Sequence, residues 1–167
     1  YFFPVESAPV GISSYDNNAV ILTEGFPEVA AITDPRNVVP TVLTYREPCQ
    51  SKLSIVQSEG GVMYASINGI FYIGRGGGKL LTDDYLDVAD WRRYAPTTMK
   101  SLYKDGQYIG FHSGTTVGNA VVLDTRESLA ILRQLSQRAD ATFVKPGTDI
   151  AYVAYNSQIL ELEGSEF

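Results

Sequence analysis

Residues 62–73 read VMYASINGIFYI, and the predicted fold follows from this stretch. Two apolar runs, 62–65 and 70–73, flank the turn-forming sequence Ser66-Ile67-Asn68-Gly69. An Asn-Gly pair between apolar runs is a strong hairpin signal, because a type I′ turn needs positive φ at both central residues. Aromatic and β-branched side chains also suit a pleated, half-buried surface. The stretch therefore predicts a β-hairpin.

The same design occurs three more times along the chain. Apolar runs flank a turn in residues 19–32, 102–111 and 150–162. When Val20, Val62, Leu102 and Ile150 are taken as anchors, the hairpins recur at intervals of 42, 40 and 48 residues. A four-stranded propeller blade repeats at roughly 40–50 residues. Further short strands fit between the hairpins, at residues 51–57 and 119–124.

These repeats predict an all-β, mainly antiparallel fold made of propeller-like blades in a partial ring. Residues 1–167 have room for about four blades in a single segment, and a propeller has 4–8 blades. The chain begins Tyr1-Phe2-Phe3-Pro4, without a starting Met or a basic signal-peptide region, so we expect it to be part of a longer chain. A β-sandwich is the alternative, since its hairpins also recur at loosely regular spacing.

One short helical insertion is predicted over residues 85–94, with Trp91 as its anchor and Pro96 ending it. Residues 33–48 contain three prolines and are typical of a long connection with edge-strand character.

A second helical insertion is predicted over residues 124–138. Asp124 is placed to cap this helix while Glu127 reaches back, which is a capping-box arrangement. Three leucines then fall near one helix face. They are Leu129, Leu132 and Leu135.

Composition and charge agree with many short strands and exclude several functions. The chain has 44% hydrophobic residues, 11 Tyr, 15 Gly and 8 Pro, and this mixture favours strands joined by tight turns. The net charge of −6 argues against sequence-specific nucleic-acid binding, although a wall past which DNA slides remains compatible with it. One cysteine allows no intrachain disulfide and no cysteine metal cluster. The sequence has no apolar run of about 18 residues, so no membrane-spanning helix is predicted.

The sequence GRGGGK at residues 74–79 superficially resembles a phosphate-binding loop. Such a loop needs Gly where Ile73 stands and a hydroxyl where Leu80 stands. The dinucleotide-binding fingerprint also fails, because Lys79 occupies its third Gly position. We therefore predict a flexible turn between two strands, whose Arg75 and Lys79 are available to touch a partner chain.

Other reactive residue types do not form a convincing site. His112 would need a serine and an acid such as Asp124 for a catalytic triad, and no Gly-x-Ser-x-Gly motif occurs. Cys49 has only Arg46 and Lys52 nearby to activate it, so a small buried side chain is the favoured interpretation. Four acids lack the spacing of a calcium loop. They are Asp83, Asp84, Asp87 and Asp90. We predict no catalytic, cofactor-binding or metal-binding residues.

Six tyrosines within the predicted strands allow two interpretations. The structural one is cross-strand aromatic packing, which is favoured, and the functional one is a sugar-stacking platform. These residues are Tyr64, Tyr72, Tyr103, Tyr108, Tyr152 and Tyr155.

The order of several segments resembles a propeller region of bacteriophage tail proteins. The resemblance begins with AVILTEGFP at residues 19–27 and is centred on CQSKLSIV at 49–56 and GVMYASING at 61–69. It continues through Leu81-Thr82 and closes in the following segments. They are DWRRYAPTTM at residues 90–99, YKDGQY at 103–108 and residues 148–163.

The resemblance implies a tail-nozzle or tail-hub protein of short-tailed phages, located in the virion. Such proteins are not enzymes, and copies of the chain assemble as a symmetric ring around the DNA channel, in contact with other tail proteins on the adaptor or portal side. The family supplies no catalytic residues, and its members are longer than this chain. Two alternatives come from other classes: a carbohydrate-binding β module, and a propeller hydrolase with acids such as Asp84 or Asp124.

Overall fold

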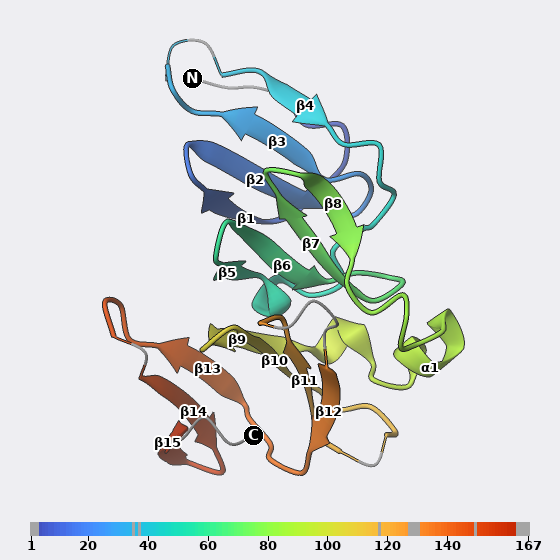
Figure 1. Ribbon diagram of the computed structural model, residues 1–167, viewed down its shortest axis with the longest axis vertical. Coiled ribbons are helices and arrows are strands. Elements are labelled where there is room, and N and C mark those ends of the chain that lie inside the picture. Colours follow the sequence, from blue (N-terminus) through green and yellow to red (C-terminus); the bar gives the residue numbers. More distant parts are fainter. Residues whose placement is uncertain are drawn as a thin grey trace.

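The computed structural model describes residues 4–34, 36, 38–116, 118–126, 131–148 and 150–162. Within these residues the chain forms fifteen strands, one α-helix and two 3-10 turns. All strand pairs are antiparallel, so the prediction of an all-β antiparallel fold is confirmed. Figure 1 shows the strands gathered into four sheets that follow one another from the N-terminal to the C-terminal end.

Each sheet is a meander, in which strands consecutive in the sequence are neighbours in space. The first sheet contains β1 (Pro9–Tyr15), β2 (Asn18–Thr23), β3 (Glu28–Ala31) and β4 (Pro40–Val42). The second contains β5 (Val56–Ser58), β6 (Gly61–Ala65), β7 (Ile70–Gly74) and β8 (Gly77–Leu80). The third contains β9 (Lys100–Lys104), β10 (Gln107–Phe111), β11 (Ala120–Asp124) and β12 (Ile131–Leu135). The fourth contains β13 (Ala141–Val144), β14 (Ala151–Tyr155) and β15 (Gln158–Leu162).

All four predicted hairpins are present, but their turns differ. Asp105-Gly106 and Asn156-Ser157 have positive φ at both residues, as a type I′ turn requires. Neither Asn68 nor Gly69 has a positive φ, so the type I′ turn predicted at these residues is wrong. Position 69 requires glycine for a different reason: the backbone there lies close to the Thr82 side chain, and a Cβ would lie 2.1 Å from Oγ1 of Thr82.

The repeat is more regular than the sequence suggested. The second strands β2, β6, β10 and β14 begin at residues 18, 61, 107 and 151, which gives intervals of 43, 46 and 44 residues. The predicted intervals were less even because the anchor Leu102 lies in a first strand, β9, whereas Val20 and Val62 lie in second strands.

Predictions outside the hairpins were right in part. The insertion at residues 85–94 contains helix α1 (Val88–Arg92), while Pro96 begins the 3-10 turn η2 (Pro96–Thr98). Residues 33–48 supply the edge strand β4, as expected. Residues 51–57 were expected to be a strand throughout, but they form the 3-10 turn η1 (Lys52–Ser54) before β5.

The predicted helix over residues 124–138 is wrong, because β12 occupies 131–135 and pairs with β11. Its leucines serve two opposite faces of the third sheet. Leu132 lies opposite Leu123 and packs towards the second sheet, whereas Leu135 lies opposite Ala120 and packs towards the fourth. Residues 127–130, which include Glu127 and Leu129, lie outside the described residues.

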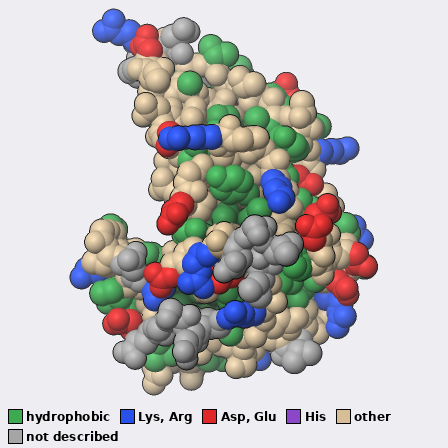
Figure 2. Space-filling view, in the orientation of Figure 1, with side chains coloured by type: hydrophobic (Ala, Val, Ile, Leu, Met, Phe, Trp, Pro, Cys, Tyr) green, Lys and Arg blue, Asp and Glu red, His purple; other side chains and the backbone are tan. Residues whose placement is uncertain are grey.

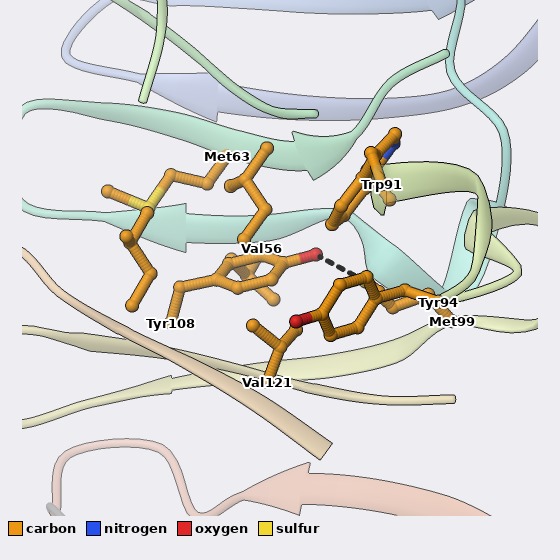
Figure 3. Close-up of a cluster of buried hydrophobic side chains, with 10 residues drawn as sticks. Val56, Met63, Trp91, Tyr94, Met99, Tyr108 and Val121 are labelled. Atoms are coloured by element: carbon orange, nitrogen blue, oxygen red, sulfur yellow. Dashed lines mark hydrogen bonds between the residues drawn. The ribbon is translucent and has the colours of Figure 1, made fainter. Parts of the chain in front are cut away.

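Three clusters of buried apolar side chains fill the spaces between consecutive sheets. The first interface joins the first and second sheets through residues such as Val20, Leu22, Val62 and Tyr64. The second interface joins the second and third sheets through residues such as Met63, Ala65, Tyr108 and Val121, several of which Figure 3 labels. The third interface joins the third and fourth sheets through residues such as Ile109, Val122, Ala151 and Val153.

Alternation along the strands explains how the inner sheets are covered on both faces. On β6, Val62 and Tyr64 point to the first interface, and Met63 and Ala65 point to the second. Successive residues of a strand point to opposite faces, so a strand that is apolar at every position requires cover on both sides. The four hairpins therefore belong to four stacked sheets, and the two-layer sandwich alternative is wrong.

The sheets converge on one side. The first strands contact each other in succession, β1 with β5, β5 with β9 and β9 with β13. No comparably extensive contact joins the fourth strands β4, β8 and β12 within the described part of the chain. The stack is therefore closer together along its first strands, which lie on the left in Figure 1.

Candidate functional site

A groove of about 900 Å³ opens between the second, third and fourth sheets. Figure 2 shows the molecule indented there, on the left. Tyr72, Tyr103 and Met63 contribute its apolar lining, and the turn between β9 and β10 forms one rim. Polar residues complete the lining. They include Gln57, Ser58, Glu59, Lys104, Asp105, Thr125 and Arg126.

A buried carboxylate organises one wall of the groove. Asp124 is almost fully buried at the end of β11. It accepts hydrogen bonds from Arg126 Nε at 3.0 Å, Arg126 Nη2 at 2.5 Å and Gln107 Nε2 at 3.0 Å. The charged hydrogen bonds from Arg126 hold the pKa of Asp124 well below its ordinary value. Asp124 is therefore a fixed structural anion and not a proton donor at neutral pH.

The cations that line the groove within the described residues are each beside a carboxylate. Arg126 pairs with Asp124, and Lys104 Nζ lies 3.2 Å from Oδ2 of Asp105. Paired charges attract a free phosphate much less than unpaired ones do. The groove is therefore better suited to a neutral or weakly charged contact than to a phosphate group.

The glycine-rich segment 74–79 contains the turn between β7 and β8 at Arg75 and Gly76, and its other residues belong to these two strands. The prediction of a turn between two strands is therefore confirmed. Arg75 reaches the first sheet, where Nε lies 2.5 Å from Oδ2 of Asp16 and Nη2 lies 3.0 Å from Oδ1. This pairing lowers the pKa of Asp16. A strand follows the loop, whereas a phosphate-binding loop is followed by a helix. The loop thus links two sheets across the first interface.

His112 is buried directly after β10 and makes no catalytic contact within the described residues. Its Nδ1 accepts a hydrogen bond from the amide of Gly114 at 3.2 Å, and Nε2 has no partner there. The ring packs edge-on against Tyr94, with centroids 5.0 Å apart. No described hydrogen bond joins it to a hydroxyl or a carboxylate, and Asp124 is bound to other residues.

We expect acid to destabilise the protein through His112. Burial lowers the pKa of His112, so the folded chain binds this proton less readily than the unfolded chain. The stabilisation that neutral His112 provides is fully present above about pH 6.5, the ordinary pKa of histidine. It decreases as the pH falls from there to the lower pKa that His112 has in the folded protein. Through His112, the free energy of unfolding changes by at most about 1.4 kcal/mol per pH unit in that window.

His112→Asn keeps an acceptor for Gly114 but removes the titration. Melting temperatures measured between pH 7.5 and 5 should fall less steeply for this variant than for the unchanged protein. Parallel curves would contradict a role for His112 in the pH dependence.

Cys49 is buried near the start of the second sheet, and its thiol donates to the carbonyl of Ser51 at 3.4 Å. Desolvation by burial raises the pKa of Cys49 to about 11. A thiol with this pKa is protonated at neutral pH, which is the opposite of an activated nucleophile. The prediction of a buried, structural cysteine is confirmed.

Alkylation tests this assignment of Cys49. At pH 8 a thiol with a pKa near 11 is roughly 200-fold less ionised than an ordinary cysteine. We expect iodoacetamide to modify the native protein at least about 100-fold more slowly than the urea-unfolded protein. Equal rates, measured by mass spectrometry, would show that Cys49 is accessible and ionised in the fold.

Two of the acidic residues around α1, Asp87 and Asp90, serve the helix. Oδ1 of Asp87 accepts from the amide of Asp90 at 2.7 Å and caps the helix, and Asp90 pairs with Arg93 at 3.5 Å. Within the described residues, no group of three or more His, Cys, Asp or Glu is arranged to hold a metal ion.

The six tyrosines are distributed over several parts of the molecule. Tyr64 and Tyr108 are fully buried in the first and second interfaces, which confirms the packing interpretation for these two residues. Tyr72 and Tyr103 line the groove. Tyr152 and Tyr155 lie on β14 and are half-buried. They therefore do not form one shared platform.

No protein-family model and no curated protein sequence matches this chain. Among the described residues, no helix is long and apolar enough to cross a membrane. The fold and the groove define the class only as an all-β protein of stacked antiparallel sheets.

Proposed function

We propose that this chain is a non-catalytic, propeller-like segment of a phage virion tail, of the nozzle or hub type. Copies of the protein form a symmetric ring that lines or supports the DNA channel and contacts other tail proteins on the adaptor or portal side. One observation carries the proposal: the two inner sheets are buried on both faces by the sheets that precede and follow them in the sequence.

Four features support the arrangement as blades. The sheets are meanders, three of them have four strands, and their second strands begin 43–46 residues apart. A propeller repeats in this way, at roughly 40–50 residues per blade. The first strands also lie close together, as the inner strands of blades around an axis do.

Two of the segments that resemble phage tail proteins meet between the second and third sheets. Residues 61–69 form β6 and the following turn, and residues 90–99 contain Trp91 and Met99. Trp91 Nε1 donates to the carbonyl of Ser66 at 2.9 Å, so two of these segments contact each other. The resemblance therefore includes residues that hold two of these segments together.

The charge of the chain is compatible with a DNA channel. The net charge is −6, and the described cations of the groove are paired with carboxylates. A net negative charge gives the chain no general attraction for a polyanion, which favours passage without trapping.

Proteomics of purified virus particles tests the proposal. Particles induced from the source culture and banded in a density gradient should contain peptides of this chain, in several copies per particle. An antibody against the chain should label one end of the particle in electron micrographs. If the protein is found only in the particle-free fraction as a monomer, the tail assignment is wrong.

A carbohydrate-binding β module is the second candidate, favoured by Tyr72 and Tyr103 in a groove with paired charges. Aromatic faces and neutral polar groups suit the apolar faces and hydroxyls of a sugar. Binding on a glycan array that is lost in Tyr103→Ala and kept in Tyr85→Ala would support this candidate. An array with no signal would exclude it for the glycans tested.

A further inference from the structure

The turn between β6 and β7 contains the single Asn-Gly pair of the sequence, Asn68-Gly69. In a flexible chain such a pair is chemically labile, because glycine has no Cβ to hinder the approach of its amide to the asparagine side chain. The Gly69 nitrogen bonds to Cγ of Asn68, the Cγ–Nδ2 bond breaks, and ammonia leaves with the amide proton. Water then opens the imide and leaves aspartate or isoaspartate at position 68.

The folded turn engages both reacting groups in hydrogen bonds. Nδ2 of Asn68 donates to Oε1 of Glu47 at 2.9 Å. The Gly69 amide donates to Oγ of Ser66 at 3.2 Å. The reaction requires the carboxamide to reach bonding distance from the Gly69 nitrogen, and it requires that nitrogen to lose its proton. Both hydrogen bonds therefore oppose the reaction.

The Glu47 carboxylate connects these two hydrogen bonds. Glu47 lies in the connection between the first and second sheets. Its Oε2 accepts from Oγ of Ser66 at 2.7 Å, which is the same hydroxyl that receives the Gly69 amide. The Glu47 carbonyl accepts from the hydroxyl of Tyr64 at 2.8 Å, and Tyr64 is fully buried in the first interface. A charged acceptor on an anchored backbone thus holds Asn68 and Ser66 together.

Both residues of the labile pair have a structural role. Gly69 leaves no space for a side chain, since a Cβ would lie 2.1 Å from Thr82 Oγ1 and 2.9 Å from Leu80 Cδ1. Asn68 supplies the donor that attaches the turn to Glu47. Deamidation replaces this donor with a second carboxylate beside Glu47, and like charges in close contact repel each other. The product therefore cannot restore the original contact.

We propose that Asn68 is a latent deamidation site, which Glu47 keeps unreacted while the β6–β7 turn stays in contact with the connection between the first two sheets. When Glu47 separates from the turn, Asn68 reacts with Gly69, and the new carboxylate prevents the contact from forming again. Local openings of this kind occur in folded proteins without global unfolding. The modification thus records such openings irreversibly.

Peptide mass spectrometry of the whole protein after incubation at pH 8 measures the conversion of the Asn68 amide to a carboxylate. Glu47→Ala removes both acceptors and should accelerate the reaction at least about tenfold, because the turn then opens more often. Glu47→Gln keeps a carbonyl oxygen for Nδ2 of Asn68 and should react several-fold more slowly than Glu47→Ala. Glu161→Ala removes an exposed carboxylate from β15 and should leave the rate unchanged.

A core variant separates the local contact from general loss of stability. Val153 is fully buried in the third interface, so Val153→Ala destabilises the fold at a distance from the turn and should not accelerate the reaction of Asn68. Equal rates for Glu47→Ala and Val153→Ala would overturn the proposal, because general unfolding would then control the reaction. A native protein that reacts as fast as the urea-unfolded chain would also overturn it. Acceleration by Glu47→Ala alone supports it.

Discussion

Replacing Trp91 with alanine should lower the free energy of unfolding by about 3–5 kcal/mol, which is the range for removing a fully buried large aromatic side chain. Trp91 is fully buried in the second interface and packs against Tyr94, with centroids 5.7 Å apart. Its Nε1 hydrogen bond to Ser66 also attaches α1 to the turn of the β6–β7 hairpin. Figure 3 shows Trp91 among the side chains of this cluster.

Two further variants make the Trp91 result specific, with stability measured by urea denaturation. Trp91→Phe keeps an aromatic ring and removes the donor to Ser66, so it should cost less than Trp91→Ala. Val88→Ala changes a residue of the same helix that is 38% exposed and should change stability by about 0.5 kcal/mol or less. A Trp91→Ala variant as stable as Val88→Ala would mean that α1 does not anchor the sheets.

Replacing Tyr108 with alanine should cost a similar amount, about 3–5 kcal/mol. Tyr108 lies on β10, is fully buried and points across the second interface, as Figure 3 shows. Its hydroxyl accepts from Ser101 Oγ at 2.7 Å and donates to the carbonyl of Ser54 at 3.2 Å. The second bond joins the third sheet to η1, beside the second sheet. Burial raises the pKa of Tyr108, so the hydroxyl stays protonated and able to donate.

Tyr108→Phe separates packing from hydrogen bonding. It should cost about 1–3 kcal/mol, because the carbonyl of Ser54 and the hydroxyl of Ser101 lose a buried partner. Tyr85→Ala is the matched control, since Tyr85 is 37% exposed and lies outside the three interfaces. If Tyr108→Phe and Tyr108→Ala both behaved like Tyr85→Ala in urea denaturation, the contact between the two sheets would not be as described.

The hairpins could be predicted because their information is local. At Asp105-Gly106, the turn residues and the flanking apolar runs agree, and the structure has the expected positive φ at both residues. The apolar runs of β6 and β7 do not alternate with polar residues, which is typical of strands buried on both faces, but this two-sided burial was not among the predictions. The stacking of sheets extends this local pattern.

The failed helix over residues 124–138 has a non-local cause. The open edge of β11 offers hydrogen bonds to β12, and the two faces of the third sheet take Leu132 and Leu135 separately. Asp124 also binds the Arg126 side chain, which is not the role expected of a helix cap. These contacts depend on sheets that the leucine spacing does not reveal, so tertiary packing determines the structure of residues 131–135.

The groove could not be predicted, because its lining comes from separate sheets. Tyr72 belongs to β7 and Tyr103 to β9, and only the stacking brings them to the same hollow. The Asp105-Gly106 turn sets only the register of β9 and β10, in which Gln107 lies opposite Lys104. The pairing of Gln107 with Asp124 belongs to β10 and β11, which a longer connection joins. The absence of an activated nucleophile was easier to foresee for Cys49, since its sequence neighbours offer little positive charge.

The stacking of consecutive sheets is most directly tested by methyl NOEs from two neighbouring residues, Val121 and Val122 of β11. Val121 should show cross peaks to methyl groups of the second sheet, such as Met63 and Ile70. Val122 should show cross peaks to methyl groups of the fourth sheet, such as Val153 and Leu162. Cross peaks from both valines to the same sheet, or from one of them to no other sheet, would contradict the stack.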